Sequence, residues 1–155
     1  MLRLLPAAVA AALVLVAPAT ATTVSGKTRS ETSLLRVMNS VRSEHGLTRL
    51  TLDPRLQRAA RSHSREMIGS NVFEHGAFGA RMAQFNVAGH VAGENLAWGT
   101  GSRGSALGIV RAWLASPEHR ANLLRPSFTR VGVADLLGAF QGFRGAHVVT
   151  ADFAG

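Results

Sequence analysis

WLASPEHRANLL, residues 113–124, is the stretch that decides how this chain folds. Apolar residues up to Trp113 recur at helical spacing after Ser105, which predicts a helix with Ser105 as its N-cap. Ser116 ends that helix and is expected to cap the next one, with Pro117 at its first position. The stretch therefore predicts two short helices that meet at a sharp corner.

Two longer helices are predicted upstream of this corner. Apolar residues at helical spacing run from Ser33 to the stop at Gly46. A second helix extends from about Pro54 to about Gly69 and has Asp53 as its N-cap. Residues 70–104 are crowded with glycine, so loops and short pieces are expected there.

The chain ends in two segments with the character of strands. Residues 130–137 alternate between two faces, and residues 147–153 are rich in β-branched and aromatic side chains. The glycine-rich stretch 138–145 joins them, which predicts an antiparallel hairpin. Helices first and strands last indicate an α+β sandwich in which helices cover a small antiparallel sheet.

The first 21 residues have the order of a secretory signal peptide. Arg3 precedes an apolar run, and small residues end in Ala19-x-Ala21. The run of about 13 residues is shorter than the ~20 that a transmembrane helix needs. We therefore expect cleavage after Ala21, no transmembrane segment in the mature chain, and a secreted protein that is extracellular or held in the cell envelope. Residues 22–32 are expected to be a flexible leader, and residues 33–155 one domain.

Composition excludes several classes of function. The chain has no cysteine, so it has no disulfide, no thiolate metal site and no thiol nucleophile. Its formal net charge of +8 at pH 7 could favour anionic lipid, acidic polymer or nucleic acid. The arginines are scattered, however, and those of residues 54–69 are expected to form one solvated helix face. No aromatic residues interleave with them, so no nucleic-acid partner is expected.

Residues 99–104, GTGSRG, match the glycine pattern of dinucleotide-binding loops. That pattern needs a buried strand before it and an acidic residue about 20 positions later. Residues 94–98 are expected to make a poor strand, and no acidic residue lies near position 124. The stretch is therefore interpreted as a flexible glycine loop.

The histidines divide into two groups. His63 lies on the apolar stripe of its helix and is interpreted as a packed core residue; three others are also taken as structural, namely His45, His90 and His147. His75 follows Phe73 and opens a glycine loop, so its ring is expected to face a cavity. His119 lies in the first turn after Pro117, where free backbone N–H groups are expected to depress its pKa.

Glu94 is a carboxyl group in a stretch of small and apolar residues, where burial requires a partner. Taken singly, Glu94, His75 and His119 each have a structural explanation, and their spacing does not join them. The chain contains no H-E-x-x-H pair and no G-x-S-x-G elbow, so the signatures of metalloproteases and serine hydrolases are absent.

Motifs in a fixed order cover about residues 33–153. They are Leu35-x-x-Met38-Asn39-x-x-Arg42, Asp53-Pro54-x-Leu56, Ala59-Ala60-x-x-His63-Ser64-x-x-Met67, Phe73-x-His75, Gly93-Glu94-Asn95-Leu96-Ala97, Trp113-x-x-Ser116-Pro117-x-His119-Arg120-x-Asn122-Leu123-Leu124 and Phe128-x-x-Val131-Gly132-Val133. This order resembles the CAP superfamily of cysteine-rich secretory, antigen 5 and pathogenesis-related proteins, in its compact, cysteine-free bacterial branch.

The resemblance implies an α-β-α sandwich with a surface cleft lined by two histidines and acidic residues. The matching positions here are His75, Glu94 and His119. Many members carry a second acid where this chain has Ser116, and Glu118 is a weaker candidate because neighbouring side chains on a helix diverge by ~100°. The loop after His75 is also less polar than in bacterial relatives.

Three functions are compatible with these observations. The favoured one is a secreted module that binds a lipid or a cell-envelope component at the cleft. The second is a hydrolase in which His75, His119 and Glu94 hold a divalent metal such as zinc. The third is a structural or interaction protein whose cleft residues only join loops.

Overall fold

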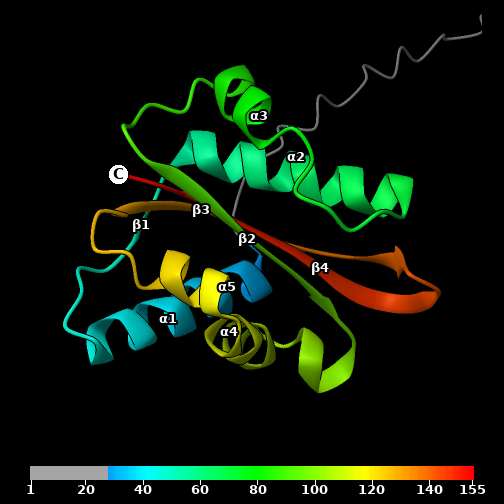
Figure 1. The fold of residues 1–155 in the computed structure, drawn as a ribbon. Coiled ribbons are helices and arrows are strands. Elements are labelled where there is room, and N and C mark those ends of the chain that lie inside the picture. Colours follow the sequence, from blue (N-terminus) through cyan, green and yellow to red (C-terminus); the bar gives the residue numbers. More distant parts are fainter. Residues whose placement is uncertain (1–27) are drawn as a thin grey trace, which may run out of the picture.

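The computed structural model describes residues 28–155 and has three layers (Figure 1). The middle layer is a four-stranded sheet. One face is covered by α2 (Pro54–Ser70) and α3 (Phe78–Gln84), and the other by α1 (Arg29–Glu44), α4 (Ala106–Ala115) and α5 (Pro117–Leu123). The predicted sandwich of helices around a small sheet is confirmed.

The last strand of the chain lies in the middle of the sheet. The strand order is β1-β3-β4-β2, in which β4 (Phe143–Ala154) is antiparallel to both β3 (Arg130–Phe140) and β2 (Ala92–Gly99). The short β1 (Thr51–Leu52) pairs in parallel with the start of β3. Strand β2 is therefore an edge strand, and this position sets the location of the site described below.

Strand β2 contradicts two predictions: that residues 94–98 make a poor strand, and that no strand precedes the glycine-rich residues 99–104. The whole of Ala92–Gly99 pairs with β4. The glycine-rich residues 99–104 thus do follow a strand, although it is antiparallel and at an edge. Their glycines allow close packing: a Cβ on Gly104 would lie 2.6 Å from the carbonyl oxygen of Gly99. The loop contains the short 3-10 helix η1 (Gly101–Gly104).

The predicted flexible leader, residues 22–32, overlaps the first helix of the structure. Helix α1 begins at Arg29, where Thr28 and Glu31 form a capping box. Glu31 is also fully buried and pairs with Arg61 of α2 at 2.6 Å. Arg61 therefore belongs to a contact between helices and not to a solvated face. The predicted signal peptide and the start of the leader lie outside the described residues.

The other elements lie close to their expected places. Helix α2 has Asp53 as its N-cap, and α4 has Ser105, whose side chain accepts from the backbone N–H of Gly108. The hairpin is tighter than predicted: β3 and β4 are joined by Gln141 and Gly142, both with positive φ (49° and 82°). Among the helices of residues 28–155, none has the length and apolar character that crossing a bilayer requires.

Candidate ligand-binding site

Three elements meet at the open edge of β2 and bring the predicted cleft residues together. Glu94 lies on β2, His75 lies in the loop between α2 and α3, and His119 lies in the first turns of α5. Nδ1 of His75 is 2.7 Å from Oε1 of Glu94, in a hydrogen bond that the imidazole donates. The charge of His75 in turn lowers the pKa of His119, so the two imidazoles are neighbours.

Glu94 is the buried centre of this arrangement. Its side chain is 3% exposed, whereas that of His75 is 58% exposed. The second carboxyl oxygen, Oε2, accepts a hydrogen bond from Nη2 of Arg81, a residue of α3 that is itself buried. Both oxygens of Glu94 are thus committed to the protein, which makes this acid a group that positions His75.

Glu94 also belongs to a buried set of ionisable residues beneath α2 and α3, which we call the acidic cluster: Glu94, Asp152, Arg81 and His63. Asp152 is fully buried opposite Glu94 in the sheet, 4.0 Å from Arg81. Neither of its carboxyl oxygens has a hydrogen-bond partner among the described residues. Burial, and then the nearby Glu94, raise the pKa of Asp152 well above its ordinary value.

His63 was predicted to be a packed core residue, and its burial confirms this. Its Nε2 donates to the backbone oxygen of Glu74 at 2.9 Å, which fixes the loop that carries His75. The same nitrogen lies 3.9 Å from Oε2 of Glu94. The residue is therefore structural, but it supports the loop at the site.

His119 is held in place through its backbone. The side chain of Asn95 donates to the carbonyl oxygen of His119 at 2.8 Å. The side chain of Asn122 donates to the carbonyl oxygen of Glu94 (3.0 Å) and to Oδ1 of Asn95 (3.1 Å). These contacts, which we call the amide network, join α5 to the edge of β2.

The pKa of His119 is lowered, as predicted, but for other reasons than the helix terminus. Burial of the half-buried ring is the main cause, and the charge of His75 is the second. The exposed Glu118 acts in the opposite direction through its charge, so it influences His119 electrostatically. The expected cap is wrong in one detail: Ser116 precedes α5 but makes no side-chain cap hydrogen bond.

The arrangement does not fit a metal ion. Within residues 28–155, no set of three or more His, Asp or Glu side chains is placed so as to hold one. Glu94 would have to give up His75 and Arg81 to become a ligand, and the guanidinium of Arg81 already occupies the position of a cation beside it.

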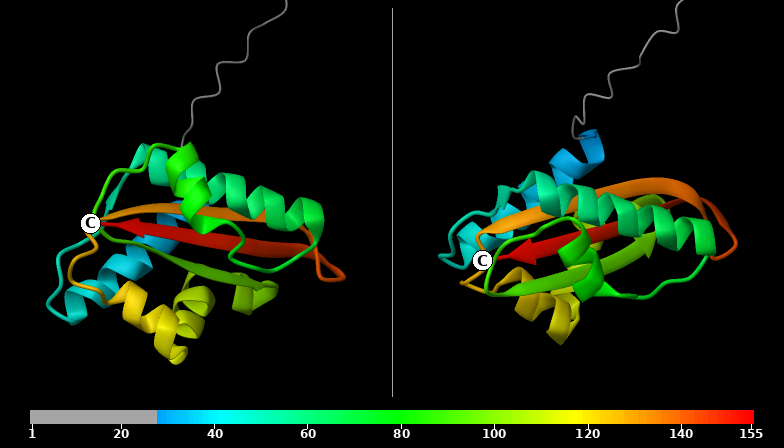
Figure 2. Two further views of the ribbon diagram at one scale, coloured as in Figure 1. Left: turned by 45° about the horizontal axis from the view of Figure 1, so that its top comes forward. Right: turned by 90° about the horizontal axis from the view of Figure 1, so that it is seen from above.

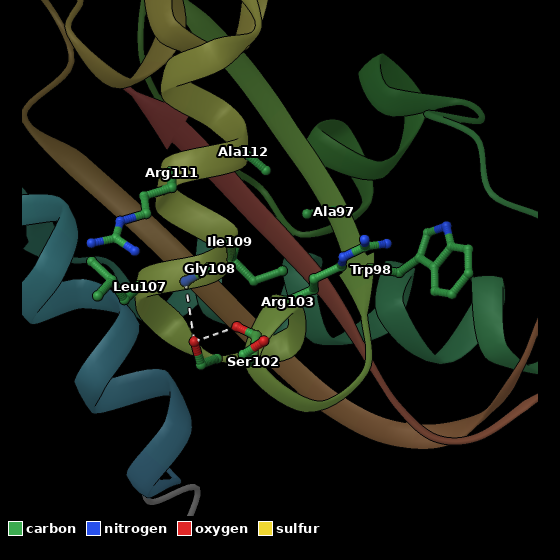
Figure 3. A pocket seen from close by; sticks show the side chains of 10 residues that line it. Ala97, Trp98, Ser102, Arg103, Leu107, Gly108, Ile109, Arg111 and Ala112 are labelled. Atoms are coloured by element: carbon green, nitrogen blue, oxygen red, sulfur yellow. Dashed lines mark hydrogen bonds between the residues drawn. The ribbon is translucent and has the colours of Figure 1, made fainter.

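A groove runs along the edge of β2 beside α4. Next to His119, a cavity of about 310 Å³ is lined by apolar side chains: Phe73, Leu96, Ala97, Trp98, Ala112 and Trp113. A second cavity of about 440 Å³ shares Ala97, Trp98 and Ala112 with the first and extends to Arg103 and Arg111 (Figure 3). The two cavities form one groove, with the imidazole of His119 in the first cavity and two arginines in the second. Arg103 extends toward Trp98, and Arg111 lies on the opposite side of α4 (Figure 3).

Four residues that build the site were not predicted to have a role. Arg81 and Asp152 complete the acidic cluster, and Asn95 and Asn122 form the amide network. For Arg81 the sequence offers no signal beyond its position in a glycine-rich region. For the amide network the sequence offers one signal. Asn122 follows His119 by three positions, so the two side chains are expected on the same side of a helix.

Fold and site together define a class, the small α-β-α sandwich domains with an imidazole-lined groove at an edge strand. A model of the CAP family, described as the cysteine-rich secretory protein family, matches residues 35–153. The chain belongs to this family.

Relatives and solved structures agree with this assignment. The Bacillus subtilis protein YkwD is 34% identical over 108 residues, which cover 66% of this chain and 41% of that protein. The B. subtilis membrane protein YlbC is 34% identical over 112 residues, 69% of this chain and 32% of that protein. This chain thus spans less than half the length of the two curated relatives.

Among solved structures, an extracellular protein of Bacillus anthracis with an SCP domain matches with a TM-score of 0.68 and 29% identity, covering 81% of this chain and 40% of that chain. An outer surface protein of Borrelia burgdorferi has the same TM-score of 0.68 at 20% identity, covering 82% of this chain and 93% of that chain. The second similarity is one of fold alone.

Proposed function

We propose that this protein is an exported ligand-binding module that holds an amphiphilic ligand, a lipid or lipid-like component of the cell envelope, in the groove between β2 and α4. The groove itself is the observation that carries the proposal. Its cavities of about 310 and 440 Å³ have largely apolar walls. The polar side chains that line them are His119 in the first cavity and Ser102, Ser105, Arg103 and Arg111 in the second. Such an arrangement is typical of sites that bury an apolar ligand and orient it through a few polar contacts.

The chemistry of the two ends supports an amphiphile with an anionic group. Arg103 and Arg111 lie on exposed surface where they can reach a phosphate or carboxylate. At the other end, the lowered pKa of His119 favours the neutral imidazole, which can donate and accept hydrogen bonds without adding charge. Export is supported by the predicted signal peptide of residues 1–21.

The groove supports binding better than hydrolysis. Glu94 is committed to His75 and Arg81, so neither a free general base nor a metal ligand is available at that position. The alternative of a purely structural protein explains the role of Glu94 but leaves the apolar groove without an explanation.

Titration with dihexanoylphosphatidylglycerol below its micelle concentration tests the proposal, with dihexanoylphosphatidylcholine in parallel. Ala112 lines both cavities on the exposed side of α4, so Ala112→Trp fills the groove without changing the core. We expect saturable binding of the anionic lipid to the wild type and loss of binding in Ala112→Trp. Ala115→Trp, an exposed change on the same helix outside the groove, is the matched control and should bind normally. Absence of binding to the wild type, or equal binding by Ala112→Trp, would overturn the proposal.

A further inference from the structure

The free end of the β3–β4 hairpin exposes a concentration of large apolar side chains. Four residues, which we call the tip patch, are exposed there: Val72 (45%), Phe73 (42%), Leu137 (67%) and Phe143 (52%). Within residues 28–155 only one further large apolar side chain is comparably exposed, Leu107 of α4 at 48%. Figure 2 shows the hairpin turn at one end of the molecule, beyond the last turn of α2.

Aromatic packing joins two members of this patch, Phe73 and Phe143, through Trp98 and the buried Phe140. The ring of Phe143 lies 5.7 Å from that of Trp98, and Trp98 lies 5.7 Å from Phe140 in an edge-on arrangement. Phe73 in turn lies 6.4 Å from Phe140. Leu137 is on the other face of the hairpin, because β3 alternates and its neighbour Leu136 faces the same side as Trp98. The tip is thus apolar on both faces.

The patch is held in one shape. The backbone N–H of Gln141 donates to Oδ1 of Asn71 at 2.7 Å, and its side chain donates to the carbonyl oxygen of Asn71 at 2.6 Å. Asn71 ends α2 with a positive φ of 56°, so these two bonds place the following Val72 and Phe73 beside the hairpin turn. No ordering of the tip is required before it meets a partner, which lowers the entropic cost of binding.

Charge at the tip favours an anionic partner. Arg144 is the one charged side chain among residues 136–146, and it is exposed. Arg103 lines the same cavity as Trp98. Glu74, next to Phe73, is the nearest acid along the loop. The whole chain carries a formal net charge of +8, so its long-range field adds to this local preference.

We infer that the tip patch docks the protein on the surface of an anionic lipid bilayer, with Phe143 and Leu137 entering the boundary between headgroups and acyl chains and Arg144 contacting lipid phosphates. Phenylalanine and leucine side chains of membrane-surface segments are buried at this depth, and a basic residue beside them is attracted to the negative surface of the membrane. The inference concerns the membrane surface and does not require a ligand in the groove, although Phe73 belongs to both the tip patch and the first cavity and Trp98 lines both cavities.

Co-sedimentation with vesicles tests the inference on purified protein that lacks residues 1–21. Vesicles of equal phosphatidylglycerol and phosphatidylcholine should retain the wild type at low salt, and phosphatidylcholine vesicles should retain much less. We expect the double variant Leu137→Ser/Phe143→Ser to reduce the partition coefficient about tenfold or more, since it removes two apolar contacts with the bilayer. Arg144→Gln should reduce it several-fold and weaken its salt dependence.

Leu107→Ser is the matched control for the tip, because it makes the same kind of change at a similarly exposed leucine that lies outside the tip and lines the second cavity of the groove. It should bind vesicles as the wild type does, and so should the groove variant Ala112→Trp. Failure of the groove proposal therefore leaves this test unaffected. Thermal unfolding of each variant verifies that these exposed changes leave the fold intact.

Tryptophan fluorescence supplies a second readout. The chain has two tryptophans, and Trp113 is 1% exposed in the core, whereas Trp98 packs against Phe143 at the tip. Brominated lipid should quench the emission of Trp98, and Trp98→Phe should remove the quenched signal. Because Trp98 also lines both cavities of the groove, the quenching supports docking by the tip only where Leu137→Ser/Phe143→Ser reduces it. Three results would overturn the inference: no retention of the wild type on anionic vesicles, equal retention of the double tip variant, or concentration-dependent dimers in sedimentation that the tip variant abolishes.

Discussion

Glu94 and Asn95 are neighbours in β2, but their side chains serve two different regions of the molecule. Glu94 joins the acidic cluster beneath α2 and α3, where a buried arginine lies between two buried acids. Asn95 joins the amide network, where neutral groups hold α5 and His119. One edge strand therefore supports both imidazoles: Glu94 binds the ring of His75 through charge, and Asn95 holds the backbone of His119 through an amide hydrogen bond. Removing one partner of a buried charge costs more free energy of folding than removing one neutral hydrogen bond.

The largest effect is expected where the charge balance is broken. Arg81→Met leaves Glu94 and Asp152 buried without their cation, and should lower the free energy of unfolding by about 3–5 kcal/mol. Urea denaturation at neutral pH measures this. Arg103→Met, at an exposed position of η1, is the control and should change stability by less than about 0.5 kcal/mol. Similar stabilities for the two variants would contradict the central role of Arg81.

Asp152 should give the acidic cluster a characteristic dependence on pH. Because its pKa is raised in the folded protein, its contribution to stability is fully present below the ordinary value of 3.8 and is lost as the pH rises through the raised pKa. The free energy of unfolding of the wild type, relative to Asp152→Asn, should therefore fall as the pH increases from about 4. Denaturation curves of both proteins at several pH values provide the difference. A difference that is constant or grows with pH would refute the assignment.

A smaller loss is expected in the amide network. Asn122→Ala removes two hydrogen bonds and leaves Oδ1 of Asn95 without this donor, which should cost about 1–3 kcal/mol. The loss should not depend on pH, in contrast to that of Asp152. Arg120→Ala, an exposed change in the same helix, should be nearly neutral. NMR chemical shifts of the His119 ring should move in Asn122→Ala and stay unchanged in Arg120→Ala.

The smallest effects separate two serines that the sequence treats alike. Ser105 accepts from the backbone N–H of Gly108 and so caps α4, whereas Ser116 makes no such bond before α5. Ser105→Ala should therefore cost about 1 kcal/mol, and Ser116→Ala less than about 0.5 kcal/mol. Thermal unfolding distinguishes them. An equal loss of stability in Ser105→Ala and Ser116→Ala would contradict this difference, because it would mean that Ser116 caps α5 in addition to the amide network.

The sequence predicted those elements that local signals determine. Helices α2 and α4 begin at their predicted caps, and α5 begins at Pro117, because caps and proline act within a few residues. The start of α1 was missed although Thr28-x-x-Glu31 is a local capping-box signal, because the polar residues around it were interpreted as a leader. The contact of Glu31 with Arg61, 30 positions away, has no local signal. Strand β2 was missed because its pairing with β4 joins residues 48 to 62 positions apart (147 − 99 and 154 − 92) and outweighs the weak strand propensity of its residues.

The candidate site shows the same division. His75, Glu94 and His119 do come together, but residue chemistry left them separate and only the family resemblance joined them. Arg81 and Asp152 were not predicted, because their role depends on which buried groups face each other across β2, β4 and α3. Burial of opposed charges is a property of the assembled layers and leaves little trace in local spacing.

The central position of β4 has a consequence for how the chain reaches its fold. Both β2 and β3 form their long ladders with this strand, so the sheet lacks the strand that joins them until residues 143–154 are available. The hairpin of β3 and β4 is local, whereas the contacts of β2 with β4 join residues 48 to 62 positions apart (147 − 99 and 154 − 92), and contacts of such separation form late and slowly. The helices made earlier have no complete surface to pack on, and the chain should remain open until its last strand arrives. Removing that strand should abolish folding altogether, whereas loss of the short β1 should leave most of the sheet in place.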